Sequence, residues 1–183
     1  PYGCSYNANQ SITVNTAPVA AQSPIAALCD NGAPITLSGG TPAGGSYSGT
    51  GVSGGQFDPA AGTQTLTYTY TDANGCTDDV DFTVTVNTAP TVTQSAISAV
   101  CSNADPITLT GGSPAGGTYS GTGVTGGEFG PSAGTQTLTY EYTDANGCTS
   151  DADFDITVNT APTVTQSTVG PLCSNDAPIT LTG

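Results

Sequence analysis

The sequence predicts an all-β protein made of tandem antiparallel β-sandwich modules, one for each copy of a repeat in the chain. Apolar and polar residues alternate with a period of two in several segments, which is typical of half-buried strands. Glycine, proline and Asn-Gly pairs separate these segments, and 25 of the 183 residues are glycine. The whole pattern returns along the chain, and no segment has the apolar period of a helix.

The clearest predicted element is a β-hairpin over residues 63–87. Its central residues Asp72-Ala73-Asn74-Gly75 contain an Asn-Gly pair, which readily adopts the positive φ values of hairpin turns. Cys76 follows the turn directly. The apolar residues expected to face inward are Leu66, Tyr68, Tyr70, Phe82, Val84 and Val86. The same hairpin returns over residues 135–159, with Cys148 after its turn.

The repeat defines the expected domain boundaries. Residues 17–88 and 89–160 align without a gap and differ at 21 of 72 positions. We expect these ranges to be two complete modules. Residues 1–16 match the last strand of an incomplete module, and residues 161–183 match the first strands of an incomplete third one. Two interpretations remain open: the chain is a window of a longer protein, or its ends add strands to other subunits.

Each module begins at an Asn-Thr-Ala-Pro joint, such as residues 87–90, where proline stiffens the connection. A first strand is predicted at residues 91–94 and a second at 106–110. The glycine-rich residues 111–135 must hold short strands and tight turns before the hairpin. Six or seven short strands per module are therefore expected, in an antiparallel sandwich.

The composition excludes several functions. The chain has no Lys, Arg or His and a formal net charge of −14. It cannot neutralise phosphates, so we expect no nucleic-acid partner, and no apolar run is long enough for membrane insertion. The usual general bases are absent, so we expect no enzyme.

Six cysteines at regular spacing in an acidic chain predict disulfides and a secreted, extracellular location. Pairing Cys29 with Cys76, and Cys101 with Cys148, would close loops of 47 residues, each worth roughly 4 kcal/mol. Each module would then be self-sufficient. A bond between modules, such as Cys29 to Cys148, is the alternative, because the two cysteines of one module, such as Cys101 and Cys148, fall at opposite poles of an ordinary sandwich. Cys4 and Cys173 would need partners in another chain or beyond this stretch.

Two motifs carry a resemblance to a known repeat type. They are GGTPAGGSYSGTGVSGGQFDP at residues 39–59 and YTYTDANGCT at residues 68–77. They resemble the immunoglobulin-like and PKD-like repeats of very large secreted surface proteins and adhesins of Bacteroidetes bacteria. The resemblance implies immunoglobulin-like sandwiches in tandem on a bacterial cell surface, and no catalytic position is carried over from it. Residues 1–4 depart from the pattern, because Pro-Tyr-Gly-Cys replaces Ala-Asn-Gly-Cys.

Acidic residues near the hairpin turns are candidate calcium ligands, because Ca²⁺ takes six to eight oxygen ligands. They are Asp72, Asp78, Asp79, Asp81, Asp144, Asp151, Asp153 and Asp155. The alternative is that most of them line the outward face of an edge strand, where charge discourages aggregation. No other cofactor is expected.

These observations predict a structural protein, a disulfide-stabilised rod, stalk or filament that contacts neighbouring repeats or further copies of itself. The rival prediction is an adhesin module that binds glycans or a partner surface, with or without calcium. The tyrosines could stack on a sugar, but their alternation with Leu66 and Leu138 favours packing in the core. A binding module should gather its exposed aromatic or acidic residues on one face, whereas a spacer should disperse them.

Overall fold

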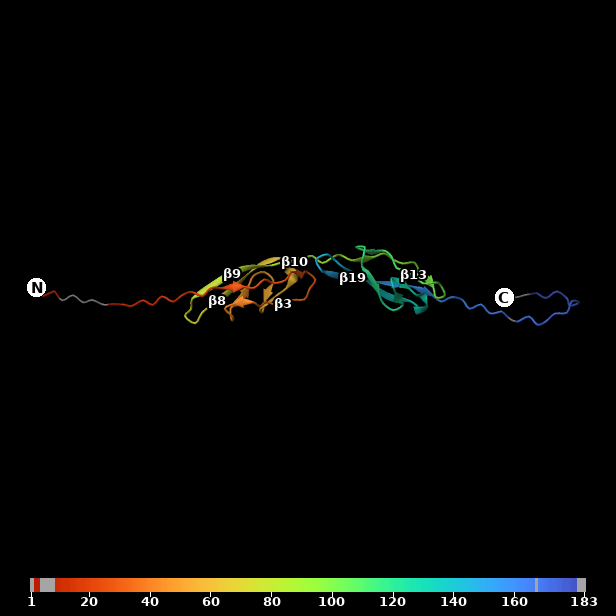
Figure 1. Cartoon of the computed structure of the whole chain (residues 1–183). Coiled ribbons are helices and arrows are strands. Elements are labelled where there is room, and N and C mark those ends of the chain that lie inside the picture. The colour runs from red at the N-terminus through yellow and green to blue at the C-terminus, as the bar shows by residue number, and fades with distance from the viewer. Residues whose placement is uncertain (1, 4–8, 167, 181–183) are drawn as a thin grey trace. The chain divides into compact units, whose positions relative to one another are not determined.

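The computed structural model describes residues 2–3, 9–166 and 168–180, and its regular elements are almost entirely β-strands (Figure 1). The chain divides into two compact units. Unit 1 holds the residues up to Pro90 together with Thr143–Thr149, and unit 2 holds Thr91–Tyr142 with the residues from Ser150 on. The turn of the second hairpin therefore belongs to unit 1.

The described residues of unit 1 from Ala21 to Asn87 form ten strands and one 3₁₀ turn. The strands are β1 (Ala21–Gln22), β2 (Leu28–Cys29), β3 (Ile35–Thr36), β4 (Gly40–Thr41), β5 (Ser46–Ser48), β6 (Val52–Ser53), β7 (Gln56–Phe57), β8 (Gln64–Thr71), β9 (Thr77–Val84) and β10 (Val86–Asn87), with η1 at Pro59–Ala61. They form small sheets in the orders β1-β4, β2-β10, β3-β7-β6 and β5-β8-β9. Most strands have only two residues, which explains why the pattern predicted fewer.

The elements from β11 on follow the same order, each at the place in the second repeat that its counterpart has in the first. They are β11 (Thr93–Gln94), β12 (Val100–Cys101), β13 (Ile107–Thr108), β14 (Gly112–Ser113), β15 (Thr118–Ser120), β16 (Val124–Thr125), β17 (Glu128–Phe129), η2 (Pro131–Ala133), β18 (Gln136–Thr143), β19 (Thr149–Ile156) and β20 (Val158–Asn159). Their sheet orders are β11-β14, β12-β20, β13-β17-β16 and β15-β18-β19. The strands predicted at residues 91–94 and 106–110 correspond to β11 and β13.

The predicted hairpin is confirmed as β8 and β9, which pair antiparallel from Gln64 opposite Val84 to Thr71 opposite Thr77. Gly75 in the turn has φ 83°, a value that favours glycine over residues with a side chain. The period of two also holds. Leu66, Tyr68 and Val84 are buried, whereas the threonines between them are half-buried or exposed. Local alternation and turn chemistry are sufficient to specify this element.

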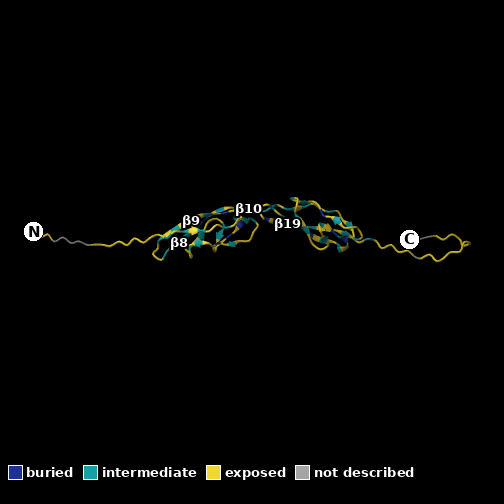
Figure 2. Ribbon diagram, in the orientation of Figure 1, coloured by how far each residue is buried: buried dark blue, intermediate teal, exposed yellow. Residues whose placement is uncertain are grey.

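Each unit has its own small core (Figure 2). The first consists of Leu37, Phe57, Leu66 and Val84. The second consists of the corresponding residues Leu109, Phe129, Leu138 and Ile156. Full burial of such a side chain stabilises by about 1.5–3 kcal/mol, so a core of this size is modest and other constraints matter.

A tyrosine holds the glycine-rich segment against the long hairpin. The Tyr68 hydroxyl accepts a hydrogen bond from the Gly45 N–H at 2.9 Å and donates one to the Pro42 carbonyl. A Cβ at Gly45 would lie 2.5 Å from this hydroxyl and 2.4 Å from the Thr69 carbonyl oxygen. Glycine is therefore required here by close approach, and Gly117 and Tyr140 make the same contact at 2.8 Å.

One pairing departs from the antiparallel sandwich that the sequence predicts. β2 and β10 pair in parallel, with Asn87 opposite Cys29, and β12 and β20 do the same with Asn159 opposite Cys101. Strand alternation carries no information about direction. The pairing places the first cysteine of each repeat beside the joint that ends the repeat.

Candidate functional site

The site with the most definite chemistry is a disulfide between Cys29 and Cys148, with an S–S distance of 2.03 Å and a Cα–Cα distance of 5.6 Å. The bond joins residues 119 positions apart. Cys29 ends β2, and Cys148 lies in the 143–149 turn of unit 1. Cys148 is completely buried.

The expected bonds within one repeat, Cys29 to Cys76 and Cys101 to Cys148, are therefore wrong. The physical reason is the length of β9. Cys76 precedes this eight-residue strand, whereas Cys29 lies opposite Asn87 beyond its far end. Eight residues at about 3.3 Å each place ~26 Å between those ends, and a disulfide requires Cα atoms about 4.4–6.8 Å apart. The alternative pairing between repeats is the one observed.

Backbone bonds fix the strand side of the disulfide. The N–H groups of Leu28 and Asp30 donate to the carbonyls of Thr85 and Asn87, both at 3.0 Å. The Asp30 carboxylate also accepts from the N–H of Ala89 at 2.8 Å, which ties the Asn-Thr-Ala-Pro joint to the strand that carries Cys29. The joint and the cysteine are thereby held as one local structure.

The turn side is organised by Asp144. Its carboxylate accepts from the N–H groups of Asn146 and Cys148, each at 2.9 Å. The Cys148 N–H is the main reason that the pKa of Asp144 lies below its usual value, although partial desolvation opposes it. The Asn31 side chain adds a bond to the Thr149 carbonyl at 2.9 Å, next to the disulfide. Asp144 therefore closes the turn that carries Cys148.

The remaining cysteines that the structure describes are free thiols. Cys101 and Cys173 are exposed, and Cys76 is half-buried. Cys4 lies outside the described residues. The predicted partners of Cys4 and Cys173 in another chain stay a prediction.

Six of the eight calcium candidates accept a hydrogen bond from within the protein, and the other two are exposed. Asp72 and Asp144 cap the two turns, and Asp78 accepts from the Ala20 N–H at 2.7 Å. Threonine hydroxyls donate to Asp81, Asp153 and Asp155 at 2.6–2.7 Å. Asp79 and Asp151 are exposed. No three acidic, cysteine or histidine side chains among the described residues could hold one metal ion.

Two of the described tyrosines lie in the interior, four are half-buried and Tyr2 is exposed. Tyr68 and Tyr140 are 1% and 2% exposed. Tyr47 packs against Tyr68 with ring centroids 4.9 Å apart and meets Phe82 edge-on at 6.0 Å. The Tyr47 hydroxyl also donates to the Gln22 side chain at 2.9 Å. These contacts hold the rings against the sheet, as the alternation with Leu66 and Leu138 predicts.

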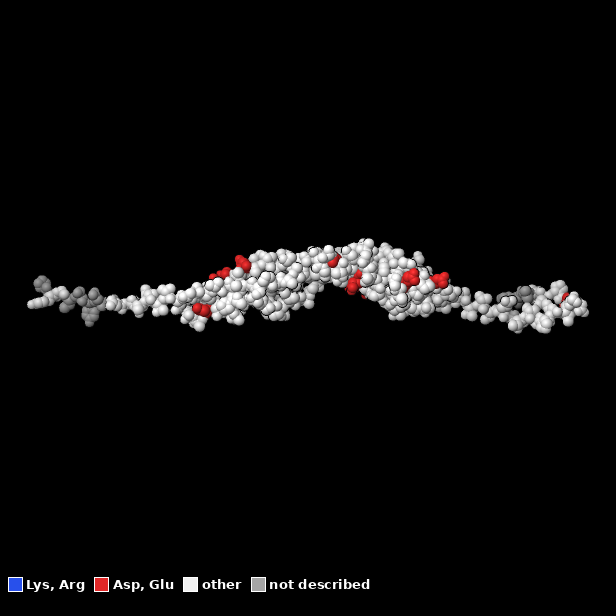
Figure 3. Space-filling model, viewed as in Figure 1, with Lys and Arg blue, Asp and Glu red and all other residues white. Residues whose placement is uncertain are grey.

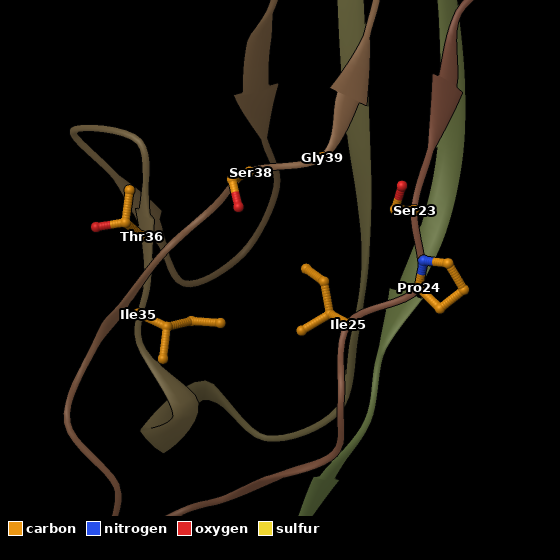
Figure 4. A pocket seen from close by; sticks show the side chains of 7 residues that line it. All are labelled: Ser23, Pro24, Ile25, Ile35, Thr36, Ser38 and Gly39. Carbon is orange, nitrogen blue, oxygen red and sulfur yellow. The ribbon is translucent and has the colours of Figure 1, made fainter.

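Open hollows occur at the edges of the strands. The first, of about 290 Å³, is lined by Ser23, Pro24, Ile25, Ile35, Thr36, Ser38 and Gly39. Ile25 and Ile35 point toward one another across it, and few polar groups converge (Figure 4). Two further hollows of about 200 Å³ are lined by corresponding residues around Pro34 and Pro106. None combines an enclosed cavity with a reactive group.

The acidic groups form separate patches on the visible surface, with no basic residue to pair with (Figure 3). No helix among residues 2–3, 9–166 and 168–180 has the length and hydropathy to cross a membrane. Comparison with models of known protein families gives no match, and comparison with curated proteins gives none either. The cysteine chemistry and the repeat therefore carry the functional argument.

The sequence pattern identified the cysteines but not the residues whose hydrogen bonds hold the backbone around them. Asn31 was not a candidate, although an Asn follows the corresponding cysteine in each repeat, at Asn103 and again at residue 175. Asp72 and Asp144 were expected as calcium ligands together with the acidic residues after the turns, whereas in the structure their carboxylates accept from the N–H groups of Cys76 and Cys148 and so position these cysteines.

Proposed function

We propose that this chain is an extracellular structural protein, in which tandem immunoglobulin-like β-sandwich modules, one per sequence repeat, form a rod, stalk or filament on a bacterial surface. The observation that carries the proposal is the Cys29–Cys148 disulfide, which connects one repeat to the next. Disulfides persist in oxidising compartments and are rare in the cytosol. The formal net charge of −14 also favours solubility outside the cell.

The bond suits a load-bearing role because it connects two distant points of the chain directly through covalent bonds. Force applied to the ends of the chain passes from Cys29 to Cys148 through the sulfur atoms, and residues 30–147 carry no tension. The small cores of the modules then need not resist the load alone. The chain also contains no Lys or Arg, so proteases that cut after basic residues have no site in it.

The location can be tested by immunogold electron microscopy of intact producing cells, with an antibody raised against the purified chain. We expect gold particles outside the cell envelope and, after alkylation of thiols during extraction, a Cys29–Cys148 bond in the recovered protein. Labelling confined to the cytosol, or recovery of the chain with all its cysteines alkylated, would refute the proposal.

A further inference from the structure

We propose that Cys101 forms a disulfide like that of Cys29, and that its partner is the cysteine directly after the hairpin turn in a further copy of the module. Cys76 is such a turn cysteine. In solution the partner is a second copy of this chain, so Cys101 of one molecule bonds to Cys76 of the next. The inference rests on the proposed structural function and names the partner and the bond through which the structure extends.

The strand that carries Cys101 has the same conformation as the strand that already forms a disulfide. β12 pairs in parallel with β20, as β2 pairs with β10. The N–H groups of Val100 and Ser102 donate to the carbonyls of Thr157 and Asn159 at 3.0 and 2.8 Å, matching the bonds around Cys29. The Ser102 hydroxyl accepts from the Ala161 N–H at 3.0 Å, in the place of the Asp30 carboxylate. Cys101 is exposed in a strand with the same backbone bonds as the strand of Cys29.

The turn that carries Cys76 likewise matches the turn of Cys148. The Asp72 carboxylate accepts from the Cys76 N–H at 2.9 Å, the same distance as in the bonded turn. The Gly75 N–H donates to the Asp72 carbonyl at 3.1 Å, as Gly147 does to Asp144. The glycines after the two Asn residues share φ 83°. The free thiol thus needs no backbone rearrangement to occupy the position of Cys148.

The two kinds of cysteine lie at opposite ends of a module, because β9 separates them by about 26 Å. A module cannot satisfy its own pair, so its strand cysteine requires another copy's turn cysteine. Such a contact is heterologous, with different surfaces on the two partners, and it generates open linear assemblies when it does not close. Each additional copy leaves one new cysteine of each kind.

A hydrogen bond beside the disulfide supplies a second point of recognition. Asn31 donates to the carbonyl of Thr149, the residue directly after the turn cysteine. The corresponding residues are Asn103 and Thr77. In the proposed bond the Asn103 amide of one copy donates to the Thr77 carbonyl of the other, which orients the turn before the sulfur atoms react.

The chemistry is a thiol–disulfide exchange with a small-molecule disulfide such as oxidised glutathione. The Cys76 thiolate attacks one sulfur of the oxidant, and one thiol of the oxidant leaves. The Cys101 thiolate then attacks the mixed disulfide and releases the second thiol. The protein loses two electrons and two protons, and the oxidant is reduced to two thiols.

The test uses two complementary variants of the full chain, Cys101→Ser and Cys76→Ser, each also carrying Cys4→Ser and Cys173→Ser. They are incubated alone and mixed in a glutathione buffer at neutral pH. We expect each variant alone to remain monomeric on a non-reducing gel and the mixture to form a dimer. The chain with both cysteines should form a ladder of oligomers.

Cleavage before Asp identifies the linkage, since it releases Cys76 in residues 72–77 and Cys101 in residues 81–104. We expect these two peptides to be joined in the mixed dimer. Adding Asn103→Ala to the Cys76→Ser variant, which supplies Cys101, should slow dimer formation several-fold. Disulfide dimers of either variant alone, at the extent seen in the mixture, would show unselective thiol pairing and overturn the proposal.

A lengthened chain, in which residues 89–160 are repeated once after residue 160, separates the two sources of the partner. If Cys101 becomes linked within that chain to a peptide with the sequence of residues 144–150, a following repeat supplies the turn. If only the mixed dimer forms, a second molecule supplies it. If neither bond forms, the proposal is wrong, even where the Cys29–Cys148 bond and extracellular labelling still support the structural function.

Discussion

The disulfide between Cys29 and Cys148 should limit how far the chain extends under force. The perturbation is the double variant Cys29→Ser/Cys148→Ser, which removes both thiols so that neither remains buried and unpaired. The bond closes a separation of 119 residues. At about 3.6 Å per extended residue, it locks away ~430 Å of chain from extension. The matched control is Cys101→Ser, a change in the corresponding strand that breaks no bond.

The assay is single-molecule force spectroscopy of the chain held by tags at its two ends. Without reductant, the wild-type chain and the Cys101→Ser control should both reach a fully unfolded length that is shorter than that of the double variant by the locked segment. Adding dithiothreitol to the wild type should release the missing length, and adding it to the double variant should change nothing.

The same bond should raise the free energy of unfolding. The chain-entropy estimate for a loop of this length is about 5 kcal/mol. With a slope of ~2 kcal/mol/M in guanidinium chloride, its loss should lower the unfolding midpoint by about 2.5 M. Equal extended lengths for the oxidised wild type and the double variant, or a Cys101→Ser control that lengthens as much, would refute the argument.

Three further predictions concern the interior and the turns. Tyr68→Phe should destabilise by about 1–3 kcal/mol in urea unfolding, because it unpairs the Gly45 N–H, whereas Tyr70→Phe should have little effect. Gly45→Ala should cost about 1–3 kcal/mol or more by the same assay, since its Cβ would lie 2.4 Å from a carbonyl oxygen of β8. The pKa of Asp144 is lowered by folding, so its stabilisation is present above pH 4 and is lost as the pH falls through the folded value. Asp144→Asn should therefore flatten the fall in thermal stability between pH 5 and pH 2, and the exposed control Asp79→Asn should flatten it less. A wild-type response in Tyr68→Phe, Gly45→Ala or Asp144→Asn would count against the corresponding contact.

Local features of the sequence determined much of this molecule. Alternation over residues 63–87 specified β8, β9 and their inward side chains, because the side-chain period of a strand leaves little choice once one face is apolar. The Asn-Gly pair specified the turn at Gly75. The outward position of Asp79 and Asp81 also followed from the period of two.

Features that depend on distant segments needed the tertiary structure. The parallel pairing of β2 with β10 joins the start of a repeat to its end, and nothing in either two-residue strand encodes its direction or partner. The close approach of Tyr68 to Gly45 depends on how the glycine-rich segment folds over the hairpin.

The disulfide shows most clearly where sequence reasoning ends. Regular spacing placed one strand cysteine and one turn cysteine in every repeat, and it was compatible with bonds within a repeat or between repeats. The length of β9 decides between them, because it holds Cys29 and Cys76 at opposite ends of one module, while the 143–149 turn presents Cys148 to Cys29 at a Cα distance of 5.6 Å. The sequence thus determined which residues can form bonds, and three-dimensional distance alone determined which bond forms.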